Sequence, residues 1–139
     1  MILLINNTHM ENTPSNGKKI LLTEDDKFFR DLLTHKLTVA GFEVTSVSDG
    51  ESAITTLETF APDIAILDIL LPGMNGFDIL SKIRKNEKIK DLPVIFLSNL
   101  SSRDDILKGK VLGVTTFLIK ASVTPDEVIA EVKKILNIK

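Results

Sequence analysis

Residues 62–76 read PDIAILDILLPGMNG, and this stretch decides how the rest of the chain is interpreted. The apolar run 64–67 lies between Pro62 and the Pro-Gly step at 72–73, which favours a short strand buried on both faces of a parallel sheet. That strand ends on a carboxylate, Asp68. Open α/β sheets bind ligands at the carboxyl ends of their strands, and the Pro-Gly and Asn-Gly steps predict a tight, exposed loop there. We therefore interpret Asp68 as the reactive centre; the alternative from this stretch alone is that Asp68 only caps the loop.

Composition indicates one globular domain and excludes several classes of protein. The chain has 139 residues, 43% hydrophobic and 26% charged, which suits one core better than two. A net charge of −2 with scattered Lys and Arg argues against direct binding of nucleic acid. The sequence has no Cys, which excludes disulfides and thiolate metal sites and suits a reducing, cytoplasmic location. The apolar run 1–5 is too short for a signal or membrane segment, so we expect no membrane association.

The N-terminal part of the chain is polar and lacks the periodic pattern of the later residues. Residues 6–19 include Pro14 and Gly17 and show neither helical nor strand periodicity. We predict a flexible arm over residues 1–18 and a folded domain over residues 19–139. The His9-Met10 step leaves open that Met10 is the natural start and that part of the arm is an added extension.

From Ile20 onward, short apolar runs alternate five times with amphipathic segments, which is typical of βαβ units around a parallel sheet. Gly41 is expected to end the first helix, and the TPDE sequence at 124–127 to open the last one with a capping box. Right-handed crossovers then place helices on both faces of a five-stranded parallel sheet, an α/β fold. The expected strands are 19–23, 43–46, 63–67, 93–97 and 114–119, and the expected helices are 27–40, 50–60, 76–86, 101–112 and 125–136.

Acidic residues also follow the first expected strand, as Glu24-Asp25-Asp26. If the first and third strands are neighbours, Glu24, Asp25 and Asp68 meet at one edge, where mutual repulsion raises their pKa values. Such a cluster calls for a cation. Oxygen ligands without Cys or a convergent His favour a hard ion, and Mg²⁺ completed by waters and a phosphate oxygen fits a shallow site at a sheet edge. The alternative is an acidic first turn that favours the helix dipole, the only role we expect for Asp26.

The fourth and fifth expected strands end in a hydroxyl and an ammonium group. Ser98 follows the run 93–97, and Lys120 follows the run 114–119. Taken singly, Ser98 would be a loop or capping residue and Lys120 a solvated surface lysine. Together with the acids they form an arrangement that loop composition rarely produces by chance.

On these five ordered motifs, residues 19–136 resemble a response-regulator receiver domain, the phosphoacceptor module of two-component signalling. The resemblance implies a flavodoxin-like (βα)5 fold and a bound Mg²⁺. It also implies a role for each site residue: Asp68 as the phosphoacceptor, Glu24 and Asp25 as the acidic pair that holds the metal with Asp68, the backbone carbonyl of Leu70 as a further metal ligand, Ser98 as the hydroxyl that moves toward the phosphoryl group, Phe117 as the aromatic switch residue, and Lys120 as the lysine that pairs with the phosphoryl oxygens.

The function that the resemblance implies is transfer of a phosphoryl group from a histidine kinase or a histidine phosphotransfer protein to Asp68. The new charge would switch the face made by helix 101–112, strand 114–119 and helix 125–136, which a downstream protein target would recognise. The chain would then be no enzyme toward other substrates, since it catalyses only its own phosphotransfer and dephosphorylation. The sequence leaves open a homodimer through the same face. It also leaves open a stand-alone regulator or a receiver cut from a longer regulator or hybrid kinase.

Some residues depart from the family's pattern. Ala121 follows Lys120 where most receivers have Pro and commonly a cis peptide bond, so either the site supplies the strain of a cis bond or the bond is trans. Asn99 stands where a small residue is usual, which predicts a narrower entry for a phosphodonor. Leu70 and Leu100 are apolar at positions that in the family tune hydrolysis. Since neither side chain can orient an attacking water, we expect slow self-dephosphorylation.

Other classes of protein compete with this interpretation. A phosphate-independent pseudo-receiver, acting only as an interaction module, would have the same fold, and Asn99 and Ala121 are the residues that favour it. A hydrolase of the aspartyl-phosphate type usually needs a second Asp two residues after the nucleophile, where this chain has Leu70. The sequence contains neither of the glycine-rich phosphate-binding motifs of nucleotide-binding folds, which argues against those folds.

Overall fold

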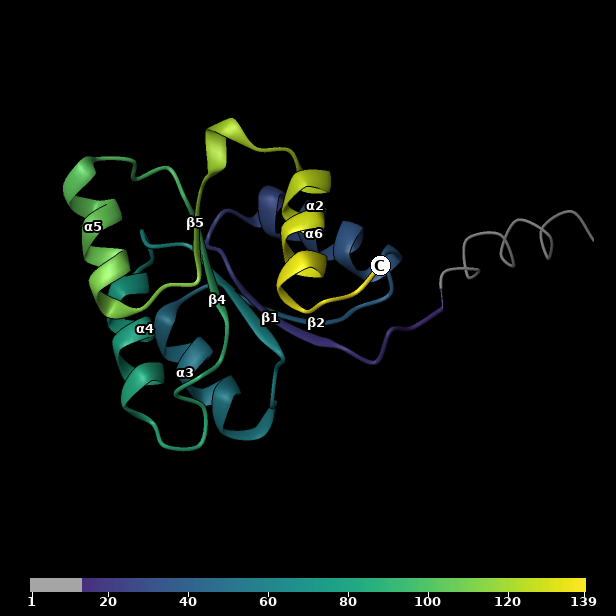
Figure 1. Ribbon diagram of the computed structural model, residues 1–139, viewed down its shortest axis with the longest axis horizontal. Coiled ribbons are helices and arrows are strands. Elements are labelled where there is room, and N and C mark those ends of the chain that lie inside the picture. Colours follow the sequence, from purple (N-terminus) through teal and green to yellow (C-terminus); the bar gives the residue numbers. More distant parts are fainter. Residues whose placement is uncertain (1–13) are drawn as a thin grey trace, which may run out of the picture.

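The computed structural model describes residues 14–139 and shows a sheet between two layers of helices (Figure 1). Residues 1–13, which include most of the predicted arm and the His9-Met10 step, lie outside the described residues. The strands are β1 (Lys19–Thr23), β2 (Glu43–Val47), β3 (Ile64–Leu67), β4 (Val94–Ser98) and β5 (Thr116–Ile119). The helices are α2 (Lys27–Val39), α3 (Gly50–Thr59), α4 (Gly76–Lys85), α5 (Arg103–Leu112), the 3₁₀ turn η1 (Lys120–Ser122) and α6 (Pro125–Ile135).

The five strands form one parallel sheet in the order β2-β1-β3-β4-β5. Leu67 at the end of β3 pairs with Thr23 at the end of β1 and with Phe96 in β4. After β2 the chain crosses to the other side of β1, so β1 and β3 are neighbours in the middle of the sheet. The predicted five-stranded parallel α/β fold is therefore confirmed, and the strand ends that carry acids are adjacent.

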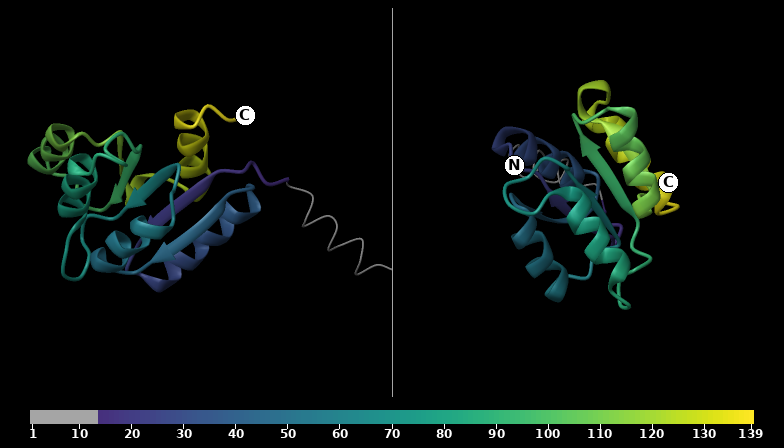
Figure 2. Two further views of the ribbon diagram at one scale, coloured as in Figure 1. Left: turned by 90° about the horizontal axis from the view of Figure 1, so that it is seen from below. Right: turned by 90° about the vertical axis from the view of Figure 1, so that its left-hand side faces the viewer.

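Helices cover both faces of the sheet, as expected. Figures 1 and 2 show α2 and α6 on one side and α3, α4 and α5 on the other. Each face buries its own apolar cluster. One cluster joins side chains of α3 and α4 to alternate residues of β1, β3 and β4, and the other joins Leu33 and Leu37 of α2 and Val128 and Val132 of α6 to the remaining ones. Strand β3 is buried along its whole length, which explains its unbroken apolar sequence.

The helices begin at side-chain caps that the sequence encodes locally. Asp26, Asp49 and Ser102 each accept a backbone N–H from the first turn of their helix. Asn75 and Thr124 form full capping boxes, of which the one at Thr124 was predicted. After α2 the chain turns at Gly41, whose φ of +102° lies in the left-handed region that glycine adopts without strain.

Strand β1 has the predicted bounds, and every other end agrees with the prediction or differs from it by one residue, except the starts of α5 and β5. The larger differences have local causes. Helix α5 begins at Arg103 instead of residue 101, because Ser102 is its extended N-cap and accepts the Asp105 amide. Strand β5 begins at Thr116 instead of residue 114, because the Val114 amide still bonds to Gly109 at the end of α5. The turn η1 was not predicted.

None of the helices in the described part of the chain is both long enough and apolar enough to cross a lipid bilayer.

Candidate acidic site at the carboxyl edge of the sheet

Three carboxylates meet where β1 and β3 end. Glu24 and Asp25 follow β1 directly, and Asp68 follows β3. The Asp68 amide donates a hydrogen bond to the Thr23 carbonyl at 3.0 Å, so the pairing of β3 with β1 continues as far as Asp68. One oxygen of each carboxylate lies within 4.8 Å of the others, so the predicted cluster forms. Glu24 is only 2% exposed and Asp68 5%, whereas Asp25 is open to solvent.

Burial changes the electrostatics of this cluster. Loss of hydration raises the pKa of Glu24 above its ordinary value, and the neighbouring Asp68 charge adds to the effect. Hydrogen bonds from Lys120 and from the Asp26 amide lower the pKa of Glu24 and offset part of the increase. Repulsion between acids was the predicted cause of a raised pKa, but for Glu24 the larger cause is desolvation.

The donor set of the cluster fits a hard divalent cation. All three candidate ligands offer carboxylate oxygens, and the exposure of Asp25 leaves room for waters and for a phosphate oxygen. Leu70 lies in the loop after Asp68, and its amide donates to Asp68 Oδ1 at 3.2 Å. Its carbonyl remains a predicted further ligand. Gly76 lets the far end of this loop approach the Asp68 backbone closely, because a Cβ at position 76 would lie 2.5 Å from the Asp68 carbonyl oxygen.

Lys120 reaches into the cluster from the end of β5. Its Nζ donates to Glu24 Oε1 at 2.5 Å and to Asp68 Oδ2 at 2.9 Å, and its side chain is 16% exposed. Burial is the largest single influence and lowers the pKa of Lys120, but the hydrogen bonds to the two carboxylates and their negative charges together outweigh it and hold that pKa above its ordinary value. The ammonium group is therefore charged and can offset negative charge that develops at Asp68.

Ser98 is the last residue of β4 and is fully buried. It pairs in register with Ile119, the residue before Lys120. Its Oγ accepts the amide of Leu100 at 3.4 Å, which holds the start of the following loop. The hydroxyl thus lies at the same edge as the acids, on the strand between β3 and β5, as predicted.

Phe117 is half-buried in β5 and belongs to a row of three aromatic rings. Its ring packs edge-on against Phe96 at 5.7 Å, and Phe96 packs in the same way against Phe77 at 5.5 Å. Gly109 of α5 permits this packing, because a Cβ there would lie 3.3 Å from both Phe117 and Phe96. Phe117 is therefore wedged between β4 and α5, and its role as a switch remains a prediction.

Contacts around the site include several that the sequence prediction missed. Arg30 Nη1 donates to the Glu24 carbonyl at 2.8 Å and ties the acidic loop to α2. The Phe29 ring centre lies 5.1 Å from Lys120 Nζ. The pair Phe29-Arg30, one helical turn after the acids, is visible in the sequence. The contact of Phe29 with Lys120 is not, because the two residues lie far apart along the chain.

Two of the residues that depart from the family's pattern, Asn99 and Ala121, contact each other. Asn99 Oδ1 accepts the Ala121 amide at 3.1 Å, which joins the loops after β4 and β5. Pro in place of Ala121 has no N–H to donate, so the two departures are complementary. The peptide bond between Lys120 and Ala121 is trans.

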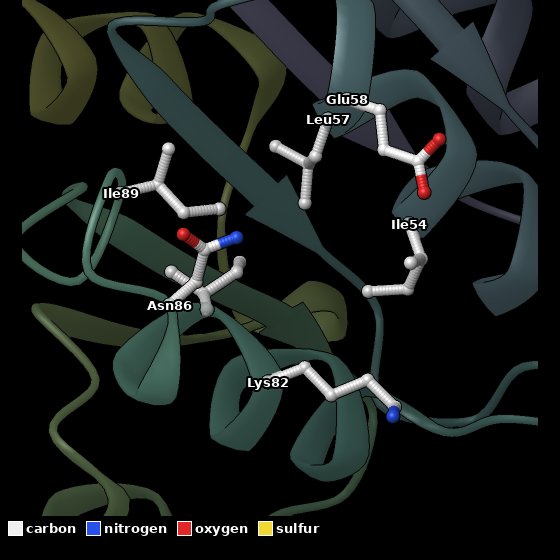
Figure 3. A pocket seen from close by; sticks show the side chains of 7 residues that line it. Ile54, Leu57, Glu58, Lys82, Asn86 and Ile89 are labelled. Atoms are coloured by element: carbon white, nitrogen blue, oxygen red, sulfur yellow. The ribbon is translucent and has the colours of Figure 1, made fainter.

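A separate pocket of about 120 Å³ opens between α3 and α4. Figure 3 shows Ile54, Leu57 and Glu58 of α3 on one side, with Lys82 of α4, Asn86 and Ile89 opposite them. None of its lining residues is a predicted site residue. The acidic site therefore lies outside this pocket.

Comparison with known proteins agrees with the geometry. A family model described as the response regulator receiver domain matches residues 20–133. The transcriptional regulatory protein GltR of Pseudomonas aeruginosa is 37% identical over 123 residues, which cover 88% of this chain and 50% of GltR. The alkaline phosphatase synthesis transcriptional regulatory protein PhoP of Bacillus subtilis is 34% identical over 121 residues, which cover 87% of this chain and 49% of PhoP. The chain thus spans about half the length of these relatives.

Solved structures show the same fold over nearly their whole length. A putative response regulator from Chloroflexus aurantiacus aligns with a TM-score of 0.80 at 30% identity, covering 86% of this chain and 98% of that one. The chemotaxis response regulator CheY4 of Vibrio cholerae aligns with a TM-score of 0.79 at 27% identity, covering 85% and 98%. By its sequence and its fold, the chain belongs to the family of response regulator receiver domains of two-component signalling.

Proposed function

We propose that Asp68 accepts a phosphoryl group from a histidine kinase or a histidine phosphotransfer protein, and that Mg²⁺ binds at Glu24, Asp25 and Asp68 with the Leu70 carbonyl. One observation carries the proposal. A buried carboxylate, Asp68, lies 2.9 Å from a charged ammonium group inside a cluster of three acids. A nucleophile, a countercharge and a set of metal ligands are the parts that phosphoryl transfer to a carboxylate needs.

In the proposed reaction an Asp68 carboxylate oxygen attacks the phosphorus of a phosphohistidine. A P–O bond forms while the P–N bond breaks, and its electron pair returns to the imidazole nitrogen, which takes up a proton from solvent. Lys120 stays beside the carboxylate and offsets charge on the transferred oxygens. A bound Mg²⁺ would neutralise further charge on the phosphoryl oxygens and on the acid pair. Catalysis is limited to this self-modification and its reversal by hydrolysis, and no other substrate is proposed.

The acyl phosphate would act as a switch because it brings negative charge and acceptor oxygens to the edge where Ser98 and Lys120 lie. Ser98 would exchange its contact with the Leu100 amide for the phosphoryl group. Phe117 would then turn into the space behind β4 and change the face of α5, β5 and α6. A downstream protein would bind that face, and a second copy of the chain is the alternative partner. The cytoplasm is the proposed location, because the resemblance places the phosphodonor there.

Intact mass spectrometry after incubation with acetyl phosphate tests the proposal. We expect the wild type to gain one phosphoryl group in the presence of Mg²⁺ and much less after chelation. Asp68→Asn should gain none. Asp91→Asn, which changes an exposed aspartate in the loop before β4, is the matched control and should behave as the wild type. Labelling of Asp68→Asn to the wild-type extent would contradict the assignment of the phosphoacceptor.

One observation favours a second candidate, a phosphate-independent interaction module. The Asn99–Ala121 hydrogen bond joins the two loops beside the site, where a phosphodonor would have to approach. Titration with beryllofluoride and Mg²⁺, followed by amide NMR shifts, separates the two functions. A receiver switch should respond at the Asp68 loop and at β5. If no adduct forms with any donor and beryllofluoride causes no shifts, the interaction module is the better account.

A further inference from the structure

The first turn of α2 brings an aromatic ring against the lysine of the site. The centre of the Phe29 ring lies 5.1 Å from Lys120 Nζ, which is within the range of a cation–π contact. The ammonium group is mostly shielded from water, which strengthens its attraction to the ring. We infer that Phe29 is a positioning residue that holds the Lys120 ammonium at Asp68. This inference rests on the function proposed above.

The ring is itself held in place by the loop that carries the acids. The Phe29 amide donates to the capping carboxylate of Asp26 at 3.1 Å, and the Asp26 amide donates to Glu24 Oε2 at 3.0 Å. Arg30, the next residue, is bonded to the carbonyls of Glu24 and Asp25. The Phe29 side chain is half-buried and packs against the apolar cluster under α2 and α6. The lysine therefore meets a fixed surface and not a mobile side chain.

Lys120 needs such a surface because its side chain is long and flexible, and because two carboxylates compete for its ammonium group. Glu24 and Asp68 both accept hydrogen bonds from the same Nζ. A cation at the acid pair would draw Glu24 away from the lysine, but it would not remove the contact with an uncharged ring. Phe29 thus keeps the Lys120 ammonium near Asp68 even when Glu24 no longer accepts its hydrogen bond. Fewer rotamers of the Lys120 side chain then have to be frozen at the moment of transfer.

The neighbouring residue provides a matched control. Phe28 belongs to the same turn of α2 and has the same side chain, but it is 78% exposed and points away from the core. A Leu at position 28 should therefore leave the site unchanged, whereas a Leu at position 29 keeps an apolar side chain and removes the ring.

The experiment compares rates of phosphoryl uptake from saturating acetyl phosphate with Mg²⁺ in Phe29→Leu, Phe29→Tyr, Phe28→Leu and the wild type. A fifth protein carries 3,4,5-trifluorophenylalanine at position 29, which keeps the shape of the ring and weakens its negative face. We expect Phe29→Leu and the fluorinated protein to be slower by roughly threefold to thirtyfold, the factor that a partly shielded cation–π contact gives. Phe29→Tyr and Phe28→Leu should stay near the wild type.

A purely packing role for Phe29 would give a different result. In that case the fluorinated protein would react at the wild-type rate, and the inference would be overturned even if Phe29→Leu were slow. Equal rates in all the proteins would overturn it as well.

The NMR shifts of the Lys120 ε-methylene protons test the contact without any reaction. They should be displaced by the ring current in the wild type and in Phe29→Tyr but not in Phe29→Leu. A wild type that shows this displacement yet takes up no phosphoryl group would refute the proposed function and leave the contact standing. An undisplaced signal in the wild type would refute the contact.

Discussion

Thr23 is a buried residue whose hydroxyl weakens the centre of the sheet. It ends β1, it is 1% exposed, and its Oγ1 has no hydrogen-bond partner among residues 14–139. Because a buried hydroxyl without a partner costs free energy, Thr23→Val should raise the free energy of unfolding by about 1 kcal/mol in a urea titration. Thr116→Val is the matched control, since the Thr116 hydroxyl donates to Glu131 at 3.0 Å and its loss should lower stability. A lower stability in Thr23→Val would mean that the hydroxyl is satisfied.

The side chain at position 70 bears on how long a phosphoryl group would survive. Leu70 is 56% exposed in the loop beside Asp68, and it cannot orient a water molecule for attack. We expect slow loss of the phosphoryl group from the wild type after the donor is removed, and loss roughly tenfold faster in Leu70→Asn, which supplies a polar group for that water. Leu70→Ala separates polarity from size and should remain slow. Decay followed by intact mass gives all three rates, and a wild-type lifetime of only seconds would contradict the expectation.

At the scale of elements, the end of α4 is bonded to two neighbouring segments through the side chain of Arg84, in addition to the packing of its apolar face. Its guanidinium group donates to the Gly113 carbonyl through Nε at 3.1 Å and Nη2 at 2.8 Å, and to the carbonyls of Lys90 and Leu92 at 3.0 and 2.6 Å. These bonds join the end of α4 to the turn before β5 and to the loop before β4.

Removal of that guanidinium group should loosen these three segments together. Arg84→Met keeps much of the aliphatic chain but leaves several carbonyls without their charged donor, so we expect unfolding free energy to fall by about 2–3 kcal/mol in urea. Lys85→Met changes the next residue of the same helix, which is exposed, and should alter stability by less than about 0.5 kcal/mol. A similar loss in both variants would assign the effect to surface charge and not to the bonds of Arg84.

For the whole molecule, the sequence predicted the fold and the members of the acidic site well. Alternating apolar and amphipathic runs identify parallel strands, and strand order then brings Glu24, Asp25 and Asp68 to one edge. These features depend on local pattern and on a general rule of topology. The predicted start of β5 at residue 114 was wrong, because where the strand begins depends on how α5 ends, through the hydrogen bond from the Val114 amide to the Gly109 carbonyl.

The contacts that the sequence did not predict join residues from distant parts of the chain. Phe29 meets Lys120 because the finished sheet places the first turn of α2 beside the end of β5, and Asn99 meets Ala121 because it places the segments after β4 and β5 side by side. No periodic pattern or residue spacing in the sequence indicates either contact. The residue types of the site were therefore predictable, whereas the residues that position them required the structure.

Strands β3 and β5 differ in how deeply they are buried, and this difference bears on how a change at Asp68 would affect the rest of the sheet. Strand β3, which leads to Asp68, is buried from end to end, while every residue of edge strand β5, which carries Phe117 and leads to Lys120, is half-exposed. Hydrogen–deuterium exchange should show the amides of β3 opening only with global unfolding and those of β5 opening earlier, in local fluctuations. A phosphoryl group on Asp68 would then sit at the end of a strand that opens only on global unfolding, whereas Phe117 and Lys120 belong to an edge region that can rearrange at a lower cost in free energy.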